Sequence, residues 1–216
     1  MIVRIKNDIF PSNSYALCKE GSSECLLIDP GVDFEGIERE LQNLRLTPTN
    51  IISTHGHFDH VSGVSFFVKK YNAKFYIHQD DLKTLKSVNF ALKMMKIDLK
   101  VEVPVPHNLM TGYSTALELD SLVLNVYNFP GHTNGSCLVE WGNNLFTGDT
   151  LYKKGLGLNN YPGENKEDLR ASLLKITELF NDQTLIYPGH GDSDLLGKIK
   201  MENLELKSFL YEYSGK

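Results

Sequence analysis

The segment His55-Gly56-His57-Phe58-Asp59-His60 concentrates the groups of this chain that can do chemistry. It places three imidazoles and one carboxylate within a few positions, directly after an apolar run that ends at Thr54. Imidazole nitrogens and carboxylate oxygens are the ligands that zinc and related divalent metals prefer. Buried together without a cation, these groups would leave several polar atoms unpaired, each at a cost of several kcal/mol. The segment therefore predicts a metal site; the alternative is a solvated histidine-rich loop.

Three later residues extend the predicted ligand set. His132 follows Pro130-Gly131, Asp149 lies in Gly148-Asp149-Thr150, and His190 lies in Tyr187-Pro188-Gly189-His190-Gly191. Each follows a strand-like apolar run and stands beside Gly or Pro, which is typical of a tight turn at a strand end. The set now holds five histidines and two aspartates. That is too many for one tetrahedral zinc and suits two metals that share a carboxylate.

The order of these motifs resembles the metallo-β-lactamase superfamily, and within it the short glyoxalase II-like (hydroxyacylglutathione hydrolase-like) branch. The resemblance runs from about Asn13 to His190 and beyond. It implies that one metal is held by His55, His57 and His132, and a second by Asp59, His60 and His190. Asp149 and a water or hydroxide would bridge the two. Asp29, in Leu27-Ile28-Asp29-Pro30-Gly31, matches a family position that orients a ligand histidine.

The resemblance also implies an activity, that of a metallo-hydrolase. Two divalent cations, Zn²⁺ first and Fe or Mn as alternatives, would lower the pKa of the bridging water to near neutrality. Asp59 is the predicted catalytic residue, because it can orient the resulting hydroxide. A thiolate, whose thiol pKa is about 8.5, can leave without a general acid, whereas an amide nitrogen cannot. Since the motifs hold no further obvious acid, we expect a thioesterase of glyoxalase II type that acts on a small thioester.

One departure from the family pattern concerns the substrate. Related enzymes usually carry a basic residue in a Gly-x-Gly-Arg or Gly-x-Gly-Lys stretch, where this chain has Gly155-Leu156-Gly157-Leu158. The longer C-terminal extension that supplies further basic anchors in glutathione-thioester hydrolases is also missing from this sequence, which ends at Lys216. We therefore expect weak recognition of glutathione. Lys153, Leu158 and Tyr161 are the candidate substrate-binding residues.

Several other functions share this skeleton. A persulfide dioxygenase-like enzyme would use one iron held by two His and one Asp, and a lactonase or other ester hydrolase would keep both metals. A β-lactamase of the commonest type needs a Cys as a ligand of the second metal, and Cys137 is badly placed for that role. A metal-binding module without activity is disfavoured, because nothing in the ligand set looks damaged.

Composition fits a soluble enzyme with a small-molecule substrate. The net charge is −5, and no Lys/Arg cluster exceeds two in a row, which argues against a nucleic-acid partner. No apolar run approaches the length of a membrane span, and the start of the chain lacks the apolar core of a signal peptide, so we expect a cytoplasmic protein without a membrane partner. Its oligomeric state stays open. Cys18, Cys25 and Cys137 are expected to be free thiols, with Cys18 nearly opposite Cys25 on a hairpin.

Elements with strand and helix periodicity alternate along the chain. Strands are predicted at Ile2–Lys6, Tyr15–Cys18, Cys25–Asp29, Ile51–Thr54, Lys74–His78, Ala116–Leu119, Leu122–Phe129, Ser136–Trp141, Asn144–Thr147 and Thr184–Tyr187, and helices at Phe34–Arg45, Ser62–Tyr71, Lys166–Phe180 and Leu195–Tyr213. These elements form two similar halves, which suggests two sheets packed face to face under outer helices. The family fold is such a four-layer αβ/βα sandwich, and we expect one α/β domain over residues 1–216. Periodicity alone does not separate it from a doubly wound sheet.

The two halves are joined near residues 81–113, a segment with no clear ligand. Leu82–Lys96 is predicted as a helix with Phe90, Met94 and Met95 exposed or covering the cleft, and Val101–Pro106 as an extended connector. In related enzymes this segment borders the active site, so it is the candidate substrate wall. The alternative is a surface excursion that packs on its own domain. His78 and His107 lie outside the motifs and are interpreted as structural.

Overall fold

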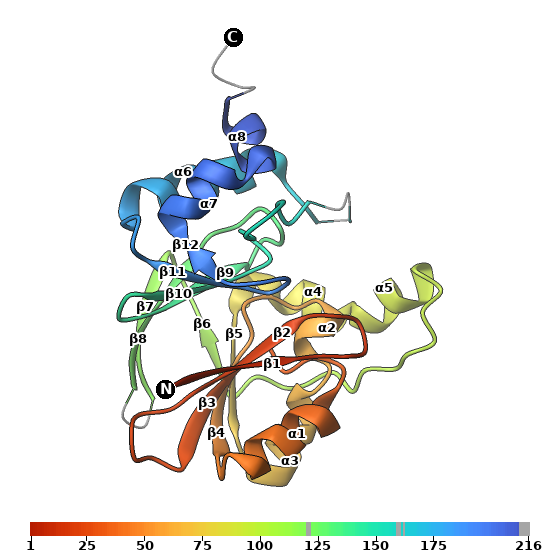
Figure 1. Ribbon diagram of the computed structural model, residues 1–216. Coiled ribbons are helices and arrows are strands. Elements are labelled where there is room, and N and C mark those ends of the chain that lie inside the picture. Colours follow the sequence, from red (N-terminus) through yellow and green to blue (C-terminus); the bar gives the residue numbers. More distant parts are fainter. Residues whose placement is uncertain (120–121, 159–160, 162, 212–216) are drawn as a thin grey trace.

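The computed structural model describes residues 1–119, 122–158, 161 and 163–211, and it shows two sheets stacked between helices (Figure 1). In the first sheet the strands run in the order β1 (Ile2–Lys6), β2 (Asn13–Leu17), β3 (Glu24–Ile28), β4 (Thr47–Ile52), β5 (Lys74–His78) and β6 (Asn108–Met110). The order in the second is β12 (Asp194–Leu195), β11 (Leu185–Pro188), β10 (Asn144–Gly148), β9 (Cys137–Trp141), β8 (Leu122–Asn128) and β7 (Ser114–Leu119).

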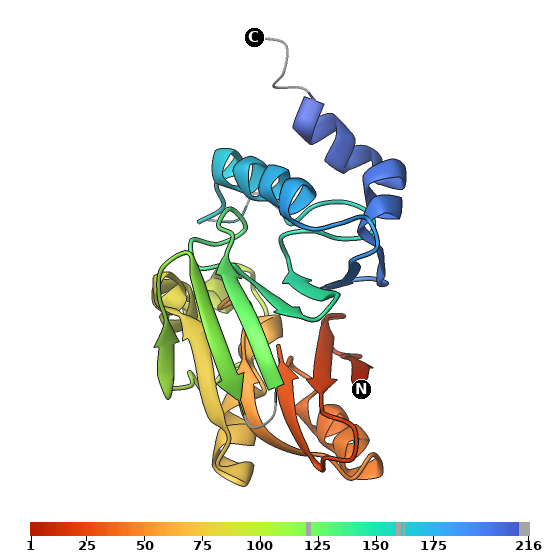
Figure 2. The ribbon, with the colours of Figure 1, turned by 90° about the vertical axis from the view of Figure 1, so that its left-hand side faces the viewer.

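Helices cover the outer face of each sheet (Figures 1 and 2). On the first sheet α1 and α3 pack against its strands, and α6, α7 and α8 lie over the second. The helices are α1 (Phe34–Asn43), α2 (Phe58–Val61), α3 (Val64–Tyr71), the 3-10 turn η1 (Gln79–Asp81), α4 (Leu82–Lys86), α5 (Val88–Met94), α6 (Lys166–Leu179), α7 (Leu196–Glu202) and α8 (Leu204–Tyr211). None of the helices in the described part of the chain is long and apolar enough to cross a membrane.

The layers follow from the alternation of side chains along the strands. Ile51 in β4 joins the apolar cluster beneath α1 and α3, while its neighbour Ile52 points to the cluster between the sheets. In β10, Phe146 joins that same central cluster, whereas Leu145 points outward to the cluster beneath α6. Strands with both faces buried therefore separate three apolar layers. This is the predicted αβ/βα sandwich.

Most strands and helices lie where the sequence predicts them. The main differences are two predicted helices that are each divided into two shorter ones. The predicted helix over residues 82–96 is divided at Ser87, whose hydroxyl donates to the Lys83 carbonyl oxygen at 2.9 Å. Phe90 and Met94 are exposed on α5, as predicted. Strand β6, which was not predicted, lies just after the predicted connector Val101–Pro106; it pairs in parallel with β5 and extends the first sheet.

The predicted C-terminal helix over residues 195–213 was wrong as a single element; residues 212 and 213 lie outside the described part. It divides into α7 and α8 at Asn203, whose side-chain oxygen accepts the Leu206 backbone N–H at 3.0 Å. The Asn203 amide nitrogen donates to the carbonyl oxygens of Tyr152 (3.2 Å) and Gly155 (3.0 Å). These tertiary hydrogen bonds fix the break. They also tie the C-terminal helices to the loop that follows Asp149.

The predicted helix over residues 34–45 is shorter than expected. α1 ends at Asn43, and the next residue, Leu44, is exposed. The three cysteines are buried free thiols, as expected. The register that pairs Leu17 with Leu26 places Cys18 beside Cys25.

Candidate metal centre

The seven predicted ligands follow strands that end at the same side of the molecule. The segment from His55 to His60 leaves the end of β4 and turns into α2, while His132, Asp149 and His190 follow β8, β10 and β11. β10 and β11 are parallel. β8 runs in the same direction as β10, because β8 and β10 are each antiparallel to the strand between them, β9. The carboxyl ends of these strands therefore share one edge of the second sheet. That edge faces the His55–His60 segment of the first.

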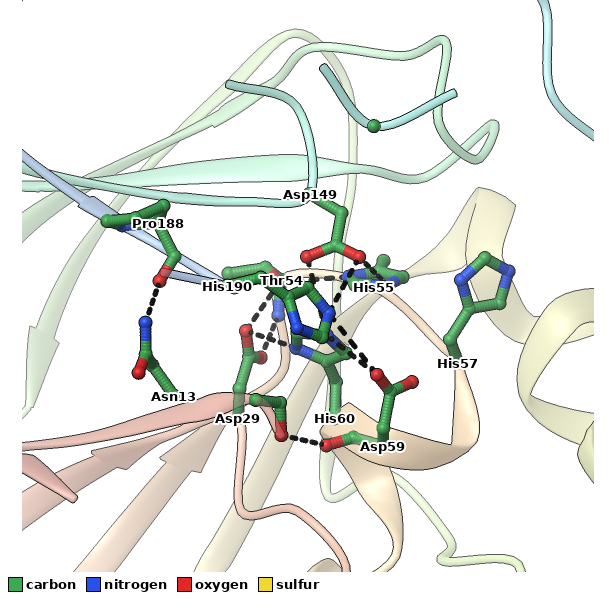
Figure 3. A network of polar contacts seen from close by, with 12 residues as sticks. Asn13, Asp29, Thr54, His55, His57, Asp59, His60, Asp149, Pro188 and His190 are labelled. Atoms are coloured by element: carbon green, nitrogen blue, oxygen red, sulfur yellow. Dashed lines mark hydrogen bonds and ion pairs between the residues drawn. The ribbon is translucent and has the colours of Figure 1, made fainter. Parts of the chain in front are cut away.

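The structure brings all seven side chains together. Figure 3 labels His55, His57, Asp59, His60, Asp149 and His190 among them. One nitrogen each of His55, His57 and His132 lie within 4.8 Å of one another, and the same holds for a carboxylate oxygen of Asp59 and nitrogens of His60 and His190. These two groups are called site 1 and site 2 below. Three histidines make site 1; one aspartate and two histidines make site 2.

Asp149 stands between the two groups. Its Oδ2 lies 3.9 Å from His55 Nε2 and 3.6 Å from His132 Nε2, both in site 1. On the other side, Asp149 Oδ2 is 3.4 Å from His190 Nε2, and its Oδ1 is 3.4 Å from His60 Nε2. One carboxylate thus faces both groups, and it enters from the side opposite to Asp59 (Figure 3).

Protein acceptors fix the orientation of four of the five imidazoles through Nδ1. His132 donates to the Gly157 carbonyl oxygen at 2.9 Å, and His190 donates to that of Pro11 at 2.5 Å. His60 Nδ1 donates to the Asp29 carboxylate at 3.0 Å. In the same way, His55 Nδ1 lies 3.1 Å from the Thr54 hydroxyl oxygen, whose own hydrogen is donated to Asp29. A histidine whose Nδ1 carries the hydrogen presents the lone pair of Nε2, so these four aim ligand atoms at the centre.

The centre contains buried polar atoms that need a cation. His55 Nε2 and Asp149 Oδ1 are buried and have no hydrogen-bond partner among the described residues. In addition, His57 Nδ1 lies 2.9 Å from His132 Nε2, which presents a lone pair. Leaving such atoms unpaired in the interior is costly, and a divalent cation satisfies nitrogen and oxygen donors together. The residues present fit a metal centre.

The charges of the ligands compensate one another. Although burial lowers the pKa of His60, the carboxylates of Asp149 and Asp59 outweigh it and raise that pKa to about 9. Burial also lowers the pKa of His57, to about 3, and holds that of His55 well below its usual range. His55 and His57 of site 1 are therefore neutral imidazoles. At site 2, in the absence of metal, the charges of Asp149 and Asp59 keep a proton on the His60 imidazole.

Asp29 occupies the orienting position predicted for it. Its carboxylate accepts hydrogen bonds from the Thr54 backbone N–H and hydroxyl, each at 2.7 Å, and from His60 Nδ1. The residue is buried and has a positive φ of 50°, which an aspartate adopts more readily than most residues. Asp29 therefore links the end of β4 to a ligand of site 2.

The three candidate substrate-binding residues are placed differently. The Tyr161 ring lies 6.3 Å from that of His57 in an edge-on arrangement and is 40% exposed, so Tyr161 stands at the entrance to site 1. Leu158 packs against the apolar cluster beneath α6. The Lys153 ammonium pairs with Asp194 at 2.8 Å, so it is held at the β12 end of the second sheet.

Residues that the sequence reasoning missed hold the His190 turn. The Asn13 amide donates to the carbonyl oxygens of Pro188 (2.9 Å) and Gly191 (2.8 Å), and the Tyr15 hydroxyl donates to that of Pro188 (2.6 Å). Figure 3 shows the contact between Asn13 and Pro188. All these bonds join β2 of the first sheet to the end of β11 in the second. A polar residue at the start of a buried strand is the only sequence signal for them.

Tyr152, three residues after Asp149, was also missed. Its ring packs edge-on against the His190 ring at 5.8 Å. Burial, followed by the charge of Asp149, holds the pKa of the phenol well above its usual value of 10. The phenol therefore stays protonated beside the shared carboxylate.

Comparison with known proteins agrees with the fold and the site. Residues 7–190 match the family described as the metallo-beta-lactamase superfamily. The probable metallo-hydrolase YqgX of Bacillus subtilis (strain 168) is 28% identical over 188 residues, which cover 86% of this chain and 88% of that protein. The hydroxyacylglutathione hydrolase GloC of Haemophilus influenzae (strain ATCC 51907 / DSM 11121 / KW20 / Rd) is 25% identical over 196 residues, with 89% and 92% covered.

Two solved structures are similar over nearly the whole chain. The BLEG-1 B3 metallo-beta-lactamase superposes with a TM-score of 0.85 at 26% identity, with 95% of this chain and 99% of that chain covered. TTHA1623 in a di-iron-bound form superposes with a TM-score of 0.83 at 27% identity, with 94% and 98% covered. This chain belongs to the metallo-beta-lactamase superfamily. It is a metallo-hydrolase with the metal-binding histidines and aspartates of one centre gathered between its two sheets.

Proposed function

We propose that this protein is a dinuclear metal-dependent thioesterase of glyoxalase II type that hydrolyses a small thioester. The observation that carries the proposal is the second group of ligands, Asp59, His60 and His190, gathered beside the first and facing the same Asp149. A single iron held by two histidines and one aspartate would leave the remaining ligands without a role. The complete set therefore favours two metals and hydrolysis over the persulfide dioxygenase alternative.

Two divalent cations held here would supply hydroxide near neutral pH and polarise the carbonyl under attack. The residues of the chain orient the reactants. Asp59 Oδ2 lies 3.3 Å from His190 Nε2 and 3.6 Å from His60 Nε2, so its carboxylate reaches into site 2 and can accept the proton of a water held there. Tyr161 flanks the entrance on the side of site 1, where the acyl group would approach.

The nature of the leaving group follows from the shortage of acids near the centre. The Tyr152 phenol stands beside the His190 ring and is not itself a proposed ligand. Its pKa is held well above 10, which makes it a poor proton donor to an amine. A thiolate leaves without protonation near neutral pH. The name of the H. influenzae relative, hydroxyacylglutathione hydrolase, supports a thioester. Because Leu158 is packed in an apolar cluster and Lys153 is paired with Asp194, neither offers a free cation to a glutathione carboxylate.

We propose zinc as the metal, with iron as the alternative that the di-iron form of TTHA1623 supports. The experiment is metal analysis of protein purified without chelator, followed by a substrate panel on protein reconstituted with zinc or with iron. The panel contains small acyl thioesters, S-lactoylglutathione, lactones, phosphoesters and a glutathione persulfide. The proposal expects thiol release from the small thioesters by the dinuclear form. Oxygen consumption with the persulfide, and no thiol release from any thioester, would contradict it.

A further inference from the structure

Asp81 is a buried carboxylate that lies outside the proposed ligand set. It ends the 3-10 turn η1 after β5, and its side chain is fully shielded from solvent. Its Oδ2 accepts a short hydrogen bond from the backbone N–H of Gly56. Its Oδ1 accepts from the Thr84 hydroxyl at 3.0 Å and from the backbone N–H of Gly135 at 3.4 Å. Burial of a carboxylate is costly, and here the cost is met by donors that come from separate loops.

The loops that Asp81 contacts carry the ligands of site 1. Gly56 stands between His55 and His57, and Gly135 lies in the turn that begins with His132. One carboxylate therefore holds two chain segments that come from different sheets and that supply all three nitrogens of site 1.

The glycines show how closely the loops approach this carboxylate. A Cβ atom at Gly56 would lie 2.8 Å from the backbone nitrogen of Leu85, near the end of α4. A Cβ atom at Gly135 would lie 2.5 Å from the Asp81 backbone nitrogen. Both loops thus rest directly on the η1–α4 segment. Because neither glycine position leaves room for a side chain against this segment, both loops lie at a fixed distance from the Asp81 carboxylate.

We propose that Asp81 is a positioning residue that sets the spacing of the site 1 ligands, by holding the His55–His57 and His132 loops on one buried carboxylate. This inference rests on the dinuclear centre proposed above. Within the described part of the chain, the site 2 ligands Asp59, His60 and His190 form no hydrogen bond with Asp81. The imidazoles of His60 and His190 are oriented by Asp29 and by the Pro11 carbonyl oxygen instead. Loss of the carboxylate should therefore weaken one metal site and spare the other.

The test compares Asp81→Asn with Asp80→Asn in the full-length protein. Asn has the shape of Asp, but its amide nitrogen cannot accept an N–H, so either Gly56 or Gly135 loses its acceptor. Asp80 is the adjacent residue, and its side chain is 52% exposed, which makes it a matched control. Zinc binding is titrated against a competing chelator, and thermal unfolding is measured in excess chelator. Asp81→Asn should bind one of its two zinc ions about 10–100-fold more weakly and the other as the wild type does. Asp80→Asn should match the wild type at both.

Each other outcome overturns the inference in a distinguishable way. Two zinc ions bound by Asp81→Asn with wild-type affinities would show that the carboxylate does not position site 1. Equal losses at both sites, together with lower stability of the metal-free protein, would show a general structural role. If the wild type itself binds fewer than two zinc ions, the dinuclear centre fails and the inference fails with it.

A second variant covers the case in which Asp81→Asn does not fold. Thr84→Val keeps the volume of the side chain and removes only the hydroxyl that orients Asp81 Oδ1. Thr84→Val should also weaken the binding of one zinc ion and not the other, but only several-fold, because the backbone N–H donors to Asp81 remain. Unchanged affinities at both sites in a folded Thr84→Val protein would overturn the inference.

Discussion

Asp29→Asn should switch the hydrogen position on a ligand histidine while leaving the shape of the site unchanged. The Asp29 carboxylate accepts three hydrogen bonds, two from Thr54 and one from His60 Nδ1, and it is buried. Asparagine keeps one acceptor oxygen and replaces the other by a donor. If the new amide nitrogen faces His60, the imidazole must offer it a lone pair. The His60 hydrogen then moves to Nε2 and points into site 2.

The opposite orientation of the amide is also unfavourable. Its nitrogen would then face the Thr54 backbone N–H, which lies 2.7 Å from the carboxylate oxygen that it replaces. A buried donor left without an acceptor costs about 1–3 kcal/mol. Outer residues that orient metal ligands contribute about 10–100-fold to metal affinity, which corresponds to about 1.4–2.7 kcal/mol. We therefore expect Asp29→Asn to lose about that much affinity at one metal, together with a measurable loss of stability.

The assay is zinc titration against a competing chelator, with thermal unfolding of the same samples. Asp33→Asn is the matched control, because Asp33 caps α1 by accepting the Gly36 backbone N–H at 3.1 Å and asparagine caps a helix equally well. The control should keep both metals and nearly the wild-type stability. If Asp29→Asn retains both zinc ions with unchanged affinity, the proposed role of Asp29 is wrong.

Three further predictions concern catalysis, substrate choice and pH. Asp59→Ala should lower kcat on the best thioester by about 100-fold or more while the fold persists, since Asp59 is proposed to orient the nucleophile; undiminished turnover would refute the assignment. Leu158→Arg must turn its side chain out of the apolar cluster beneath α6 before it can make a charge-assisted contact of about 1.5–3 kcal/mol with a glutathione carboxylate. The kcat/KM for S-lactoylglutathione, followed by thiol release, should therefore rise by at most about 10–150-fold, and that for small uncharged thioesters should not rise. In the metal-free protein the pKa of His60 is raised to about 9. The stability that His60 contributes is therefore fully present below about pH 6.5 and is lost as the pH rises through 9. Thermal unfolding in chelator between pH 6 and 10 should show this loss, and a flat profile would count against it.

The identity and placement of the predicted ligands could be read from the sequence because ligand chemistry and strand ends coincide. His132, Asp149 and His190 each follow a buried strand, and the parallel directions of those strands bring their ends to one edge. Strand alternation such as that of Leu145 and Phe146 also predicts which residues face the central layer. Pattern and spacing indicated the set of ligands, and the resemblance to the metallo-β-lactamase superfamily divided that set between two metals.

The features that the sequence did not predict depend on tertiary contacts. The break at Asn203 comes from hydrogen bonds to the distant loop around Tyr152, which no periodicity reports. Asp81 is one of many acids, and only the packed loops of Gly56 and Gly135 distinguish it. Lys153 was a candidate for substrate binding, but its ion pair with Asp194 depends on the two-residue strand β12, which is too short to predict.

The most direct test of the central claim is a crystal structure of the zinc-loaded protein with anomalous diffraction recorded at the zinc edge. The account predicts two zinc peaks within about 2.0–2.3 Å of the ligand atoms. One should lie among His55, His57 and His132, the other among Asp59, His60 and His190, with Asp149 between them. A single peak, or zinc bound away from these residues, would contradict the dinuclear centre on which the proposed hydrolysis rests.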